Sequence, residues 1–363
     1  MTKTIAFYLP QFHPIPENDL WWGKGFTEWT NVAKAKPMFP GHYQPHVPAD
    51  LGFYDLRVPE TREAQANLAK DYGISAFCYW HYWFGNGKRI LERPFDEVLE
   101  SGKPDFPFCL AWANESWSGI WHGNPKHTLM EQCYPGIEDY NNHFHYLLPA
   151  FKDPRYFKVD GKPLFMVYQP KQIPDLELFV KTFRKLAEEN GLAGIHLVAT
   201  NVDFDWDSKS NGFDAMTPAV HTKDSYLRSR NSFVNFYRRA KTSRLSKYYK
   251  KVFKKPTRIY NYSDAIQDFN EDPGNNLYYP TVIPNWDNSP RSGVNGFILH
   301  NSTPKLFKKA LENAKRLVSK YDDENKIIFI KSWNEWAEGN HLEPDLKFGH
   351  QYLEVVKEVI SGN

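Results

Sequence analysis

The sequence has 363 residues, a net charge of +2 at neutral pH, 41% hydrophobic residues and 24% charged residues. These values are typical of a globular protein with a large core, and they give no sign of a nucleic-acid partner. Aromatic residues reach 16%, and many of the 12 tryptophans and 21 tyrosines stand beside Asn, Gln, His or Glu. Flat rings with polar edges suit the apolar faces and hydroxyl rims of sugars.

The N-terminal residues lead directly into an apolar segment that has no signal-peptide pattern. No apolar run approaches the ~20 residues that a membrane-spanning helix needs. The cysteines Cys78, Cys109 and Cys133 do not form a disulfide framework. We therefore expect a cytoplasmic protein, either free or peripheral at the inner membrane.

Short apolar runs alternate with helical patterns along the chain, which predicts βαβ units around a parallel sheet. Strands are expected at residues 4–10, 74–83, 107–112, 163–168, 195–199, 213–217, 279–283 and 326–332. Helices are expected at residues 60–72, 137–151, 175–190, 302–321 and from 349 onward. We find no Gly-x-Gly-x-x-Gly turn of a doubly wound nucleotide fold. The predicted fold class is therefore α/β, a (β/α)₈ TIM barrel with long loops at its C-terminal face, forming one catalytic domain over residues 1–363.

A basic and aromatic segment interrupts this pattern between the sixth and seventh expected strands. Residues 223–258 contain thirteen Lys or Arg and one acidic residue, Asp224, and we place them in an insertion over residues 220–276. A solvated helical excursion is one interpretation. A surface for an anionic membrane or a lipid-linked glycan is the second, because clustered Lys and Arg with aromatics favour that contact. Nothing else in the sequence supports nucleic-acid binding, and the oligomeric state is left open.

The strongest chemical signal follows the eighth expected strand, in the motif Trp-Asn-Glu-Trp-Ala-Glu-Gly at residues 333–339. Glycosidic cleavage needs one carboxyl group as acid and a second as base or nucleophile. Glu335 and Glu338 can enter one cleft if the backbone turns there, which Gly339 permits. We therefore predict Glu335 and Glu338 as the catalytic carboxyl groups.

Polar and aromatic residues also follow nearly every other expected strand, where barrel enzymes carry their active sites. Together with Trp22 and His46 near the N-terminus, they form the set expected to bind a glycan substrate. This set comprises Gln11, His13, Trp22, His46, His81, Trp83, Trp112, Asn114, Glu115, Trp117, Asn285, Trp286, Trp333, Asn334 and Trp336.

Several long motifs resemble the WbsX-type family, which occurs in bacterial surface-polysaccharide loci and is often described as glycosyltransferase. They are residues 7–18 (FYLPQFHPIPEN), 21–32 (WWGKGFTEWTNV), 44–46 (QPH), 51–55 (LGFYD) and 333–339 (WNEWAEG). The sequence is also similar to glycoside hydrolase family 99, the endo-α-mannosidases, whose motif is Asn-Glu-Trp-His-Glu-Gly. Ala337 stands where that family has its His, so the finer sugar contacts differ.

The resemblance implies a retaining reaction through a 1,2-anhydro sugar intermediate. Glu335 would deprotonate the 2-hydroxyl of the sugar, and Glu338 would act as general acid and then as general base. Glu115 corresponds to an additional carboxylate near the reacting sugar.

Other functions remain as alternatives. A nucleotide-sugar transferase of O-antigen or capsule biosynthesis needs a diphosphate site, and the one near match to an Asp-x-Asp metal pair is at residues 203–205. A non-catalytic glycan-binding barrel is the second alternative. Although His42 and His46 are four residues apart, no His-Glu-x-x-His or Cys-x-x-Cys motif accompanies them, so neither a metal nor a cofactor is expected.

Overall fold

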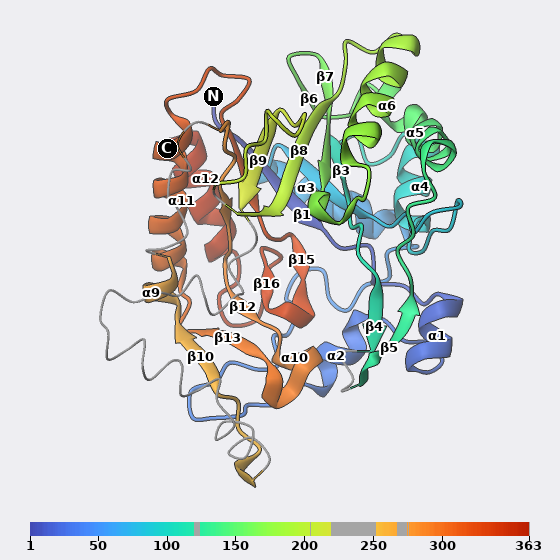
Figure 1. The fold of residues 1–363 in the computed structure, drawn as a ribbon. Helices are drawn as coiled ribbons and strands as arrows, with labels where there is room; N and C mark the ends of the chain where they lie inside the picture. The colour runs from blue at the N-terminus through green and yellow to red at the C-terminus, as the bar shows by residue number, and fades with distance from the viewer. Residues whose placement is uncertain (120–123, 204, 219–251, 267–273, 275, 363) are drawn as a thin grey trace.

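The computed structural model describes residues 1–119, 124–203, 205–218, 252–266, 274 and 276–362, and Figure 1 shows its fold. Most of the predicted basic insertion lies outside the described residues, namely residues 220–251, 267–273 and 275. Among the described helices, none has both the length and the apolar character needed to cross a lipid bilayer.

The core of the protein is a nearly closed barrel of parallel strands, which confirms the predicted fold class. In chain order the barrel strands are β1 (Lys3–Tyr8), β2 (Ala76–His81), β3 (Phe108–Trp112), β7 (Lys162–Val167), β8 (His196–Val202), β9 (Ala215–Pro218), β11 (Thr281–Val282) and β14 (Ile327–Ile330). Their spatial order is β11-β14-β1-β2-β3-β7-β8-β9. The barrel closes between β9 and the residues before β11, where Met216 N donates to Leu277 O and Tyr279 N donates to Met216 O, both at 2.9 Å.

The barrel strands are buried along nearly their whole length. In β2 and β14, for example, every residue is buried. Strands covered on both faces read as continuous apolar runs and not as alternating ones. This is why the sequence predicts the strands well. Parallel pairing aligns Ile5 of β1 with Phe329 of β14 on one side and with Ala76 of β2 on the other.

Helices cover the outside of the barrel. They are α3 (Pro59–Asp71), α4 (Arg93–Ser101), α5 (Ile137–Lys152), α6 (Leu176–Glu189), α11 (Pro304–Val318) and α12 (Gln351–Ser361). The start of α11 follows its sequence signal, because Thr303 Oγ1 caps the helix by accepting from Leu306 N at 3.3 Å and Pro304 occupies the first position. A short antiparallel strand, β6 (Lys158–Val159), pairs with β7.

Several smaller elements that were not predicted lie at the end of the barrel where the strands finish (Figure 1). They are α1 (Pro16–Trp22), α2 (Glu28–Lys34), β4 (Trp117–Gly119), β5 (Asn124–Met130), β10 (Arg258–Asn261), α9 (Tyr262–Ala265), β12 (Trp286–Asp287), α10 (Ser289–Ser292), β13 (Phe297–His300), β15 (Asn334–Glu335) and β16 (Asn340–His341). Of these, β4 pairs with β5, β15 pairs with β16, and β10, β13 and β12 form a three-stranded sheet outside the barrel. These elements build a wall around the barrel mouth.

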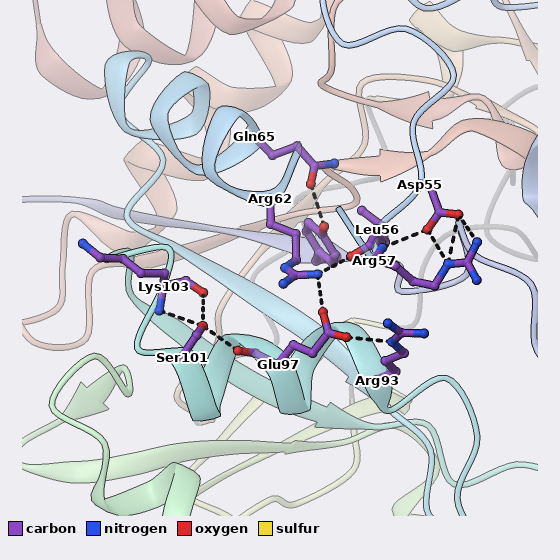
Figure 2. A network of polar contacts seen from close by, with 10 residues as sticks. Asp55, Leu56, Arg57, Arg62, Gln65, Arg93, Glu97, Ser101 and Lys103 are labelled. Atoms are coloured by element: carbon purple, nitrogen blue, oxygen red, sulfur yellow. Dashed lines mark hydrogen bonds and ion pairs between the residues drawn. The ribbon is translucent and has the colours of Figure 1, made fainter. Parts of the chain in front are cut away.

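A polar network fixes the long loop before α3 to the barrel wall (Figure 2). Arg62 of α3 contacts Glu97 of α4 at 2.8 Å and donates to the carbonyl of Leu56. From the same helix, Gln65 Nε2 donates to Glu343 Oε1 at 2.6 Å. These contacts therefore connect α3 to α4, to the loop before α3 and to the segment that follows β14.

Candidate active site

A cleft of about 640 Å³ opens at the C-terminal end of the barrel. Its walls combine aromatic rings with charged and amide side chains, as sugar-binding sites do. The side chains that line it include Gln11, Trp22, Phe26, Glu28, Asn31, Trp80, Tyr82, Glu115, Trp117, Tyr168, Arg258, Trp286, Asn288, Arg291, Lys331, Glu335 and Glu338. Seven residues from the sequence prediction thus lie in one cleft: Gln11, Trp22, Glu115, Trp117, Trp286, Glu335 and Glu338.

The segment after β14 holds both predicted catalytic glutamates in fixed positions. The Asn334 side chain accepts from Leu9 N at 2.7 Å and donates to Leu9 O at 3.1 Å, which ties this segment to the end of β1. Glu335 N donates to Ser332 Oγ at 3.0 Å, and Glu335 pairs with Asn340 between β15 and β16. Because Gly339 has φ +66°, the chain turns back directly after Glu338.

The two glutamates have different charged neighbours. Arg291 Nη1 lies 2.6 Å from Glu338 Oε1, and Arg291 Nε lies 3.0 Å from Glu28 Oε2. Lys331 Nζ lies 3.5 Å from Glu335 Oε2 and 3.8 Å from Glu338 Oε2. Glu338 therefore has an arginine in direct contact, whereas the nearer cation of Glu335 is a lysine at longer distance.

This difference separates the protonation states of the pair. Burial raises the pKa of Glu335 to about 7; Lys331 opposes this rise, and the adjacent Glu338 adds to it. Burial acts on Glu338 in the same direction, but Arg291 and Lys331 outweigh it and hold its pKa below the ordinary value. Near neutral pH Glu338 is therefore ionised, whereas Glu335 is poised between its protonated and its ionised form.

Glu115, at the end of β3, is a third carboxyl group in the cleft. Its side chain is open to solvent, yet the cleft walls still remove enough water to raise its pKa. Gln169 and Lys331 oppose this rise, and Glu338 adds to it. Glu115 thus lies within electrostatic reach of the pair on the eighth strand.

Aromatic rings surround the lysine at the base of the cleft. Lys331 Nζ lies 4.9 Å from the ring centre of Trp286 and 5.6 Å from that of Trp80. Trp117 of β4 packs edge-on against Tyr82, with ring centres 5.3 Å apart. These rings offer flat apolar faces beside the carboxyl groups, which is the arrangement that a sugar ring needs.

Two predicted residues at the end of β2, His81 and Trp83, do not line the cleft. His81 bonds to His143 of α5 with their Nε2 atoms 2.9 Å apart, and Trp83 stacks on His143 and donates to Asp139 at 3.0 Å. Side chains alternate along a strand, so Trp80 and Tyr82 face the cleft while His81 and Trp83 face the helices. The cleft residues of this segment are therefore Trp80 and Tyr82, each one position before the predicted His81 and Trp83.

Five other predicted residues form the scaffold of the site. Trp112 donates to Trp83 O at 2.8 Å, and Asn114 donates to Gln169 O at 2.9 Å. Trp333 is fully buried against Phe77. The Asn334 side chain bonds to the backbone of Leu9, and the fifth residue is Trp336.

Trp336 lies behind the motif and not over a sugar site. Its ring stacks on His341 with centres 3.7 Å apart, and its Nε1 donates to Glu343 Oε2 at 2.6 Å. His13 is likewise buried, with 1% of its surface exposed, and is not among the cleft side chains. Trp333 and Trp336 are therefore part of the buried core behind the two glutamates, where their rings pack against Phe77 and His341.

His46 and Asn285 line a separate and smaller cavity of about 60 Å³. The cavity also contains His42, whose Nε2 lies 2.6 Å from Asp287 Oδ2. Asp287 and Gly339 line this cavity, whereas the residues directly before them, Trp286 and Glu338, line the cleft. The two spaces therefore lie on opposite sides of these segments. Neither His46 nor Asn285 is thus placed to bind the same sugar as the glutamates.

Sequence reasoning missed Trp80, Tyr82, Glu28, Arg291 and Lys331. Period-two alternation after β2 could have identified Trp80 and Tyr82. Glu28 was already within the quoted N-terminal motif. Arg291 and Lys331 have no local signal, because only the fold brings them to the glutamates.

The Asp-x-Asp near match at residues 203–205 does not form a site in the described residues. Asp203 lies at the surface, paired with Lys171 at 2.6 Å, and residue 204 is outside the described part. Asp205 is exposed.

Comparison with known sequences identifies related proteins. The family described as "Glycosyltransferase WbsX" matches residues 4–356. Two curated relatives, each called "Uncharacterized protein WxcX" and from two strains of Xanthomonas campestris pv. campestris, are 36% identical over 362 and 361 residues. The match covers 98% of this chain and 49% of each relative, so the chain spans about half the length of the curated relatives it matches.

Comparison with solved structures gives the same fold over nearly the whole chain. The chain is similar to the glycoside hydrolase family 99 endo-α-mannosidase from Bacteroides thetaiotaomicron in complex with BIS-TRIS-propane, with a TM-score of 0.60 and 15% identity. That match covers 99% of this chain and 96% of the other. A "Glycoside hydrolase-like protein" matches with a TM-score of 0.58 and 15% identity, covering 99% of this chain and 93% of the other. At such identity the likeness shows the shared barrel fold.

Proposed function

Because this chain belongs to the glycosyltransferase WbsX family, we propose that it is a carbohydrate-active enzyme that cleaves or transfers a glycosyl unit of a bacterial surface polysaccharide. The observation that carries this proposal is the buried pair Glu335 and Glu338, whose pKa values are moved in opposite directions inside one ring-lined cleft. Acid–base cleavage of a glycosidic bond needs two carboxyl groups in opposite protonation states.

The shared position of the two carboxyl groups favours a retaining reaction. Inverting glycosidases hold their carboxyl groups roughly 6.5–9.5 Å apart so that a water molecule can attack from the opposite face of the sugar. Glu335 and Glu338 instead lie three residues apart on one turn, and their Oε2 atoms lie 3.5 and 3.8 Å from the same Lys331 Nζ. Both groups therefore approach the sugar from one side, which suits a 1,2-anhydro intermediate.

The roles then depend on where the pair holds a proton. When the free protein carries one proton on the pair, Glu335 holds it, because Arg291 stabilises the anion of Glu338. We assign Glu335 as the base for the 2-hydroxyl and Glu338 as the acid, so the proton has to pass from Glu335 to Glu338 as substrate binds. A sugar hydroxyl that donates to Glu335 drives this transfer, because it stabilises the ionised form of that group. Glu115 is assigned to the same bound sugar.

Substitution of each glutamate tests this mechanism. Glu335→Gln and Glu338→Gln are compared on the surface polysaccharide of the source organism and on aryl glycosides with good leaving groups, with products measured by mass spectrometry. Glu338→Gln should keep activity on the aryl glycosides, which need no acid, whereas Glu335→Gln should be inactive on both. Glu354→Gln, an exposed position on α12, is the matched control. The reverse pattern would exchange the two roles, and unchanged activity of both variants would contradict the catalytic assignment.

The family description also favours transfer to another sugar as the natural reaction. The cleft contains Arg258 as well as Arg291 and Lys331, so it has cations near the reacting centre. Turnover in ¹⁸O-labelled water separates the two reactions, because hydrolysis incorporates the label into the product and transfer does not. Sugar binding that persists in both variants without any wild-type turnover would identify a glycan-binding barrel instead.

A further inference from the structure

Behind the catalytic motif, three potential metal-ligating side chains meet beside the small cavity of about 60 Å³. They are His46, from the loop before α3, and His341 and Asp345, from the segment after Glu338. All three are buried, with 4%, 7% and 5% of their surfaces exposed. Each offers one ligand atom, and these atoms all lie within 4.8 Å of one another.

The orientation of His341 is already that of a metal ligand. Its Nδ1 donates to the carbonyl oxygen of Glu343 at 2.9 Å, which leaves the lone pair on Nε2. That Nε2 faces His46 Nδ1 at 2.8 Å and Asp345 Oδ2 at 3.9 Å. Histidine ligands in proteins typically donate their second ring nitrogen to a carbonyl or carboxylate in this way.

Asp345 is also held in position before any ligand binds. Its Oδ1 accepts from Lys347 N at 2.9 Å and from Phe348 N at 2.7 Å. These bonds fix the carboxylate so that Oδ2 is directed toward His341. Asp345 is therefore held by the backbone, whereas His46 must exchange its hydrogen bond to His341 for the ion.

His46 has a ring nitrogen that the protein leaves unsatisfied. Its Nε2 is buried and has no hydrogen-bond partner among the described residues. By contrast, His42 on the same cavity wall is fully engaged by Asp287 at 2.6 Å. The cavity has room for water, to which this nitrogen can hydrogen-bond.

The charges around the cavity suit a cation. Asp345 and Asp287 both bring a buried carboxyl group to its wall. Asp287 lines the same cavity, and although burial opposes its ionisation, bonds from His42 and Gln44 hold its pKa below the ordinary value. Lys347 contributes one positive charge to this wall.

We propose that His46 Nδ1, His341 Nε2 and Asp345 Oδ2 bind a divalent transition-metal ion of the Zn²⁺ class, with water completing the shell. The proton that His46 Nδ1 now donates to His341 Nε2 moves to the unpartnered Nε2 of the His46 ring. Two imidazoles and a carboxylate are ligands that Zn²⁺ accepts, whereas Mg²⁺ prefers oxygen alone. The ion would tie the loop of His46 to the segment after Glu338. Since Trp336 stacks on His341, such a link would hold the catalytic motif from behind.

Zinc titration of the full chain without an affinity tag tests this site. After dialysis against EDTA and then buffer, ZnCl₂ is titrated by isothermal calorimetry, and Tm is measured with and without zinc. We expect one zinc per chain and a rise in Tm with zinc, and no rise with MgCl₂. A protein that stabilises its folded state by binding shows such a ligand-dependent Tm.

Variants connect the binding to these residues. Asp345→Asn keeps an oxygen for the two backbone donors, so it should fold, and it should weaken zinc binding at least about tenfold. His46→Gln should do the same. His350→Gln, which removes a partly exposed imidazole bonded to Asp50, should bind zinc like the wild type. The proposal would be overturned if the wild type bound no zinc, or if Asp345→Asn and His46→Gln bound zinc as tightly as the wild type.

Discussion

Arg291 Nη1 lies 2.6 Å from Glu338 Oε1, and this contact decides which carboxyl group of the pair is ionised in the free protein. The same guanidinium reaches Glu28 at 3.0 Å, so one arginine holds a carboxylate from α2 and a carboxylate from the catalytic motif. A planar fork with several donors can do this, and the single ammonium of a lysine cannot.

Arg291→Lys should therefore damage catalysis while leaving the positive charge in place. We expect kcat/KM to fall about 10–100-fold, because the two-sided geometry is lost. The pKa of Glu338 should rise, which moves the acidic limb of the kcat/KM–pH profile to higher pH. Arg316→Lys on exposed α11 surface is the control. An unshifted profile in Arg291→Lys would show that Arg291 does not set the charge of Glu338.

The pH dependence should report the raised pKa of Glu335, about 7. Above that pH the pair loses its one proton, so kcat/KM should fall about tenfold per pH unit. The same group affects folding stability. Its folded pKa is higher than its unfolded value, so its stabilising contribution is complete below about pH 4.5 and is lost as the pH rises through about 7. Denaturant titrations of wild type and Glu335→Gln at pH 5 and pH 8 measure the free energy of unfolding. This free energy should fall less between pH 5 and pH 8 in the variant than in the wild type, and an equal fall in both would refute this.

The two faces of the β2 region should respond differently to substitution. Trp117 contacts the cleft-facing Tyr82, so Trp117→Ala should weaken substrate binding about 3–10-fold, as expected for one lost aromatic contact, with little change in Tm. Trp83→Phe removes the donor to Asp139 and should cost about 1–3 kcal/mol of stability without raising KM. Thermal unfolding and KM are measured for both. The assignment of faces would be wrong if Trp83→Phe raised KM and Trp117→Ala did not.

Gly339 tests how closely the motif packs on the segment that separates the two cavities. It has φ +66°, and a Cβ there would lie 3.1 Å from Asp287 N. Gly191 has φ +77° with nothing within 4 Å of such a Cβ, so Gly191→Ala carries the backbone strain alone, about 1–2 kcal/mol. Gly339→Ala should destabilise more than Gly191→Ala and should also lower kcat, because crowding against Asp287 shifts Glu338. Equal effects of the two substitutions on Tm and kcat would argue against this packing constraint.

The strand prediction succeeded because the signal is local. Parallel strands buried on both faces, such as β14 with Ile-Ile-Phe-Ile, read as apolar runs. The short strand β13 (Phe297–His300) was missed although it is equally apolar, because its partners β10 and β12 are distant in the sequence or only two residues long. Its identity as a strand depends on pairing that no local pattern contains.

The sequence by itself determined the barrel, the end of the barrel that holds the site, and the placement of Glu335 and Glu338 in the same cleft. Each of these follows from periodicity or from spacing within one segment. Only the tertiary structure decided which side of β2 faces the cleft, that Trp336 and His46 lie behind the cleft, and that Arg291 and Lys331 lie beside the glutamates. The physical reason is that electrostatic energies and ring contacts depend on distances of a few ångströms between side chains that the chain brings together only on folding.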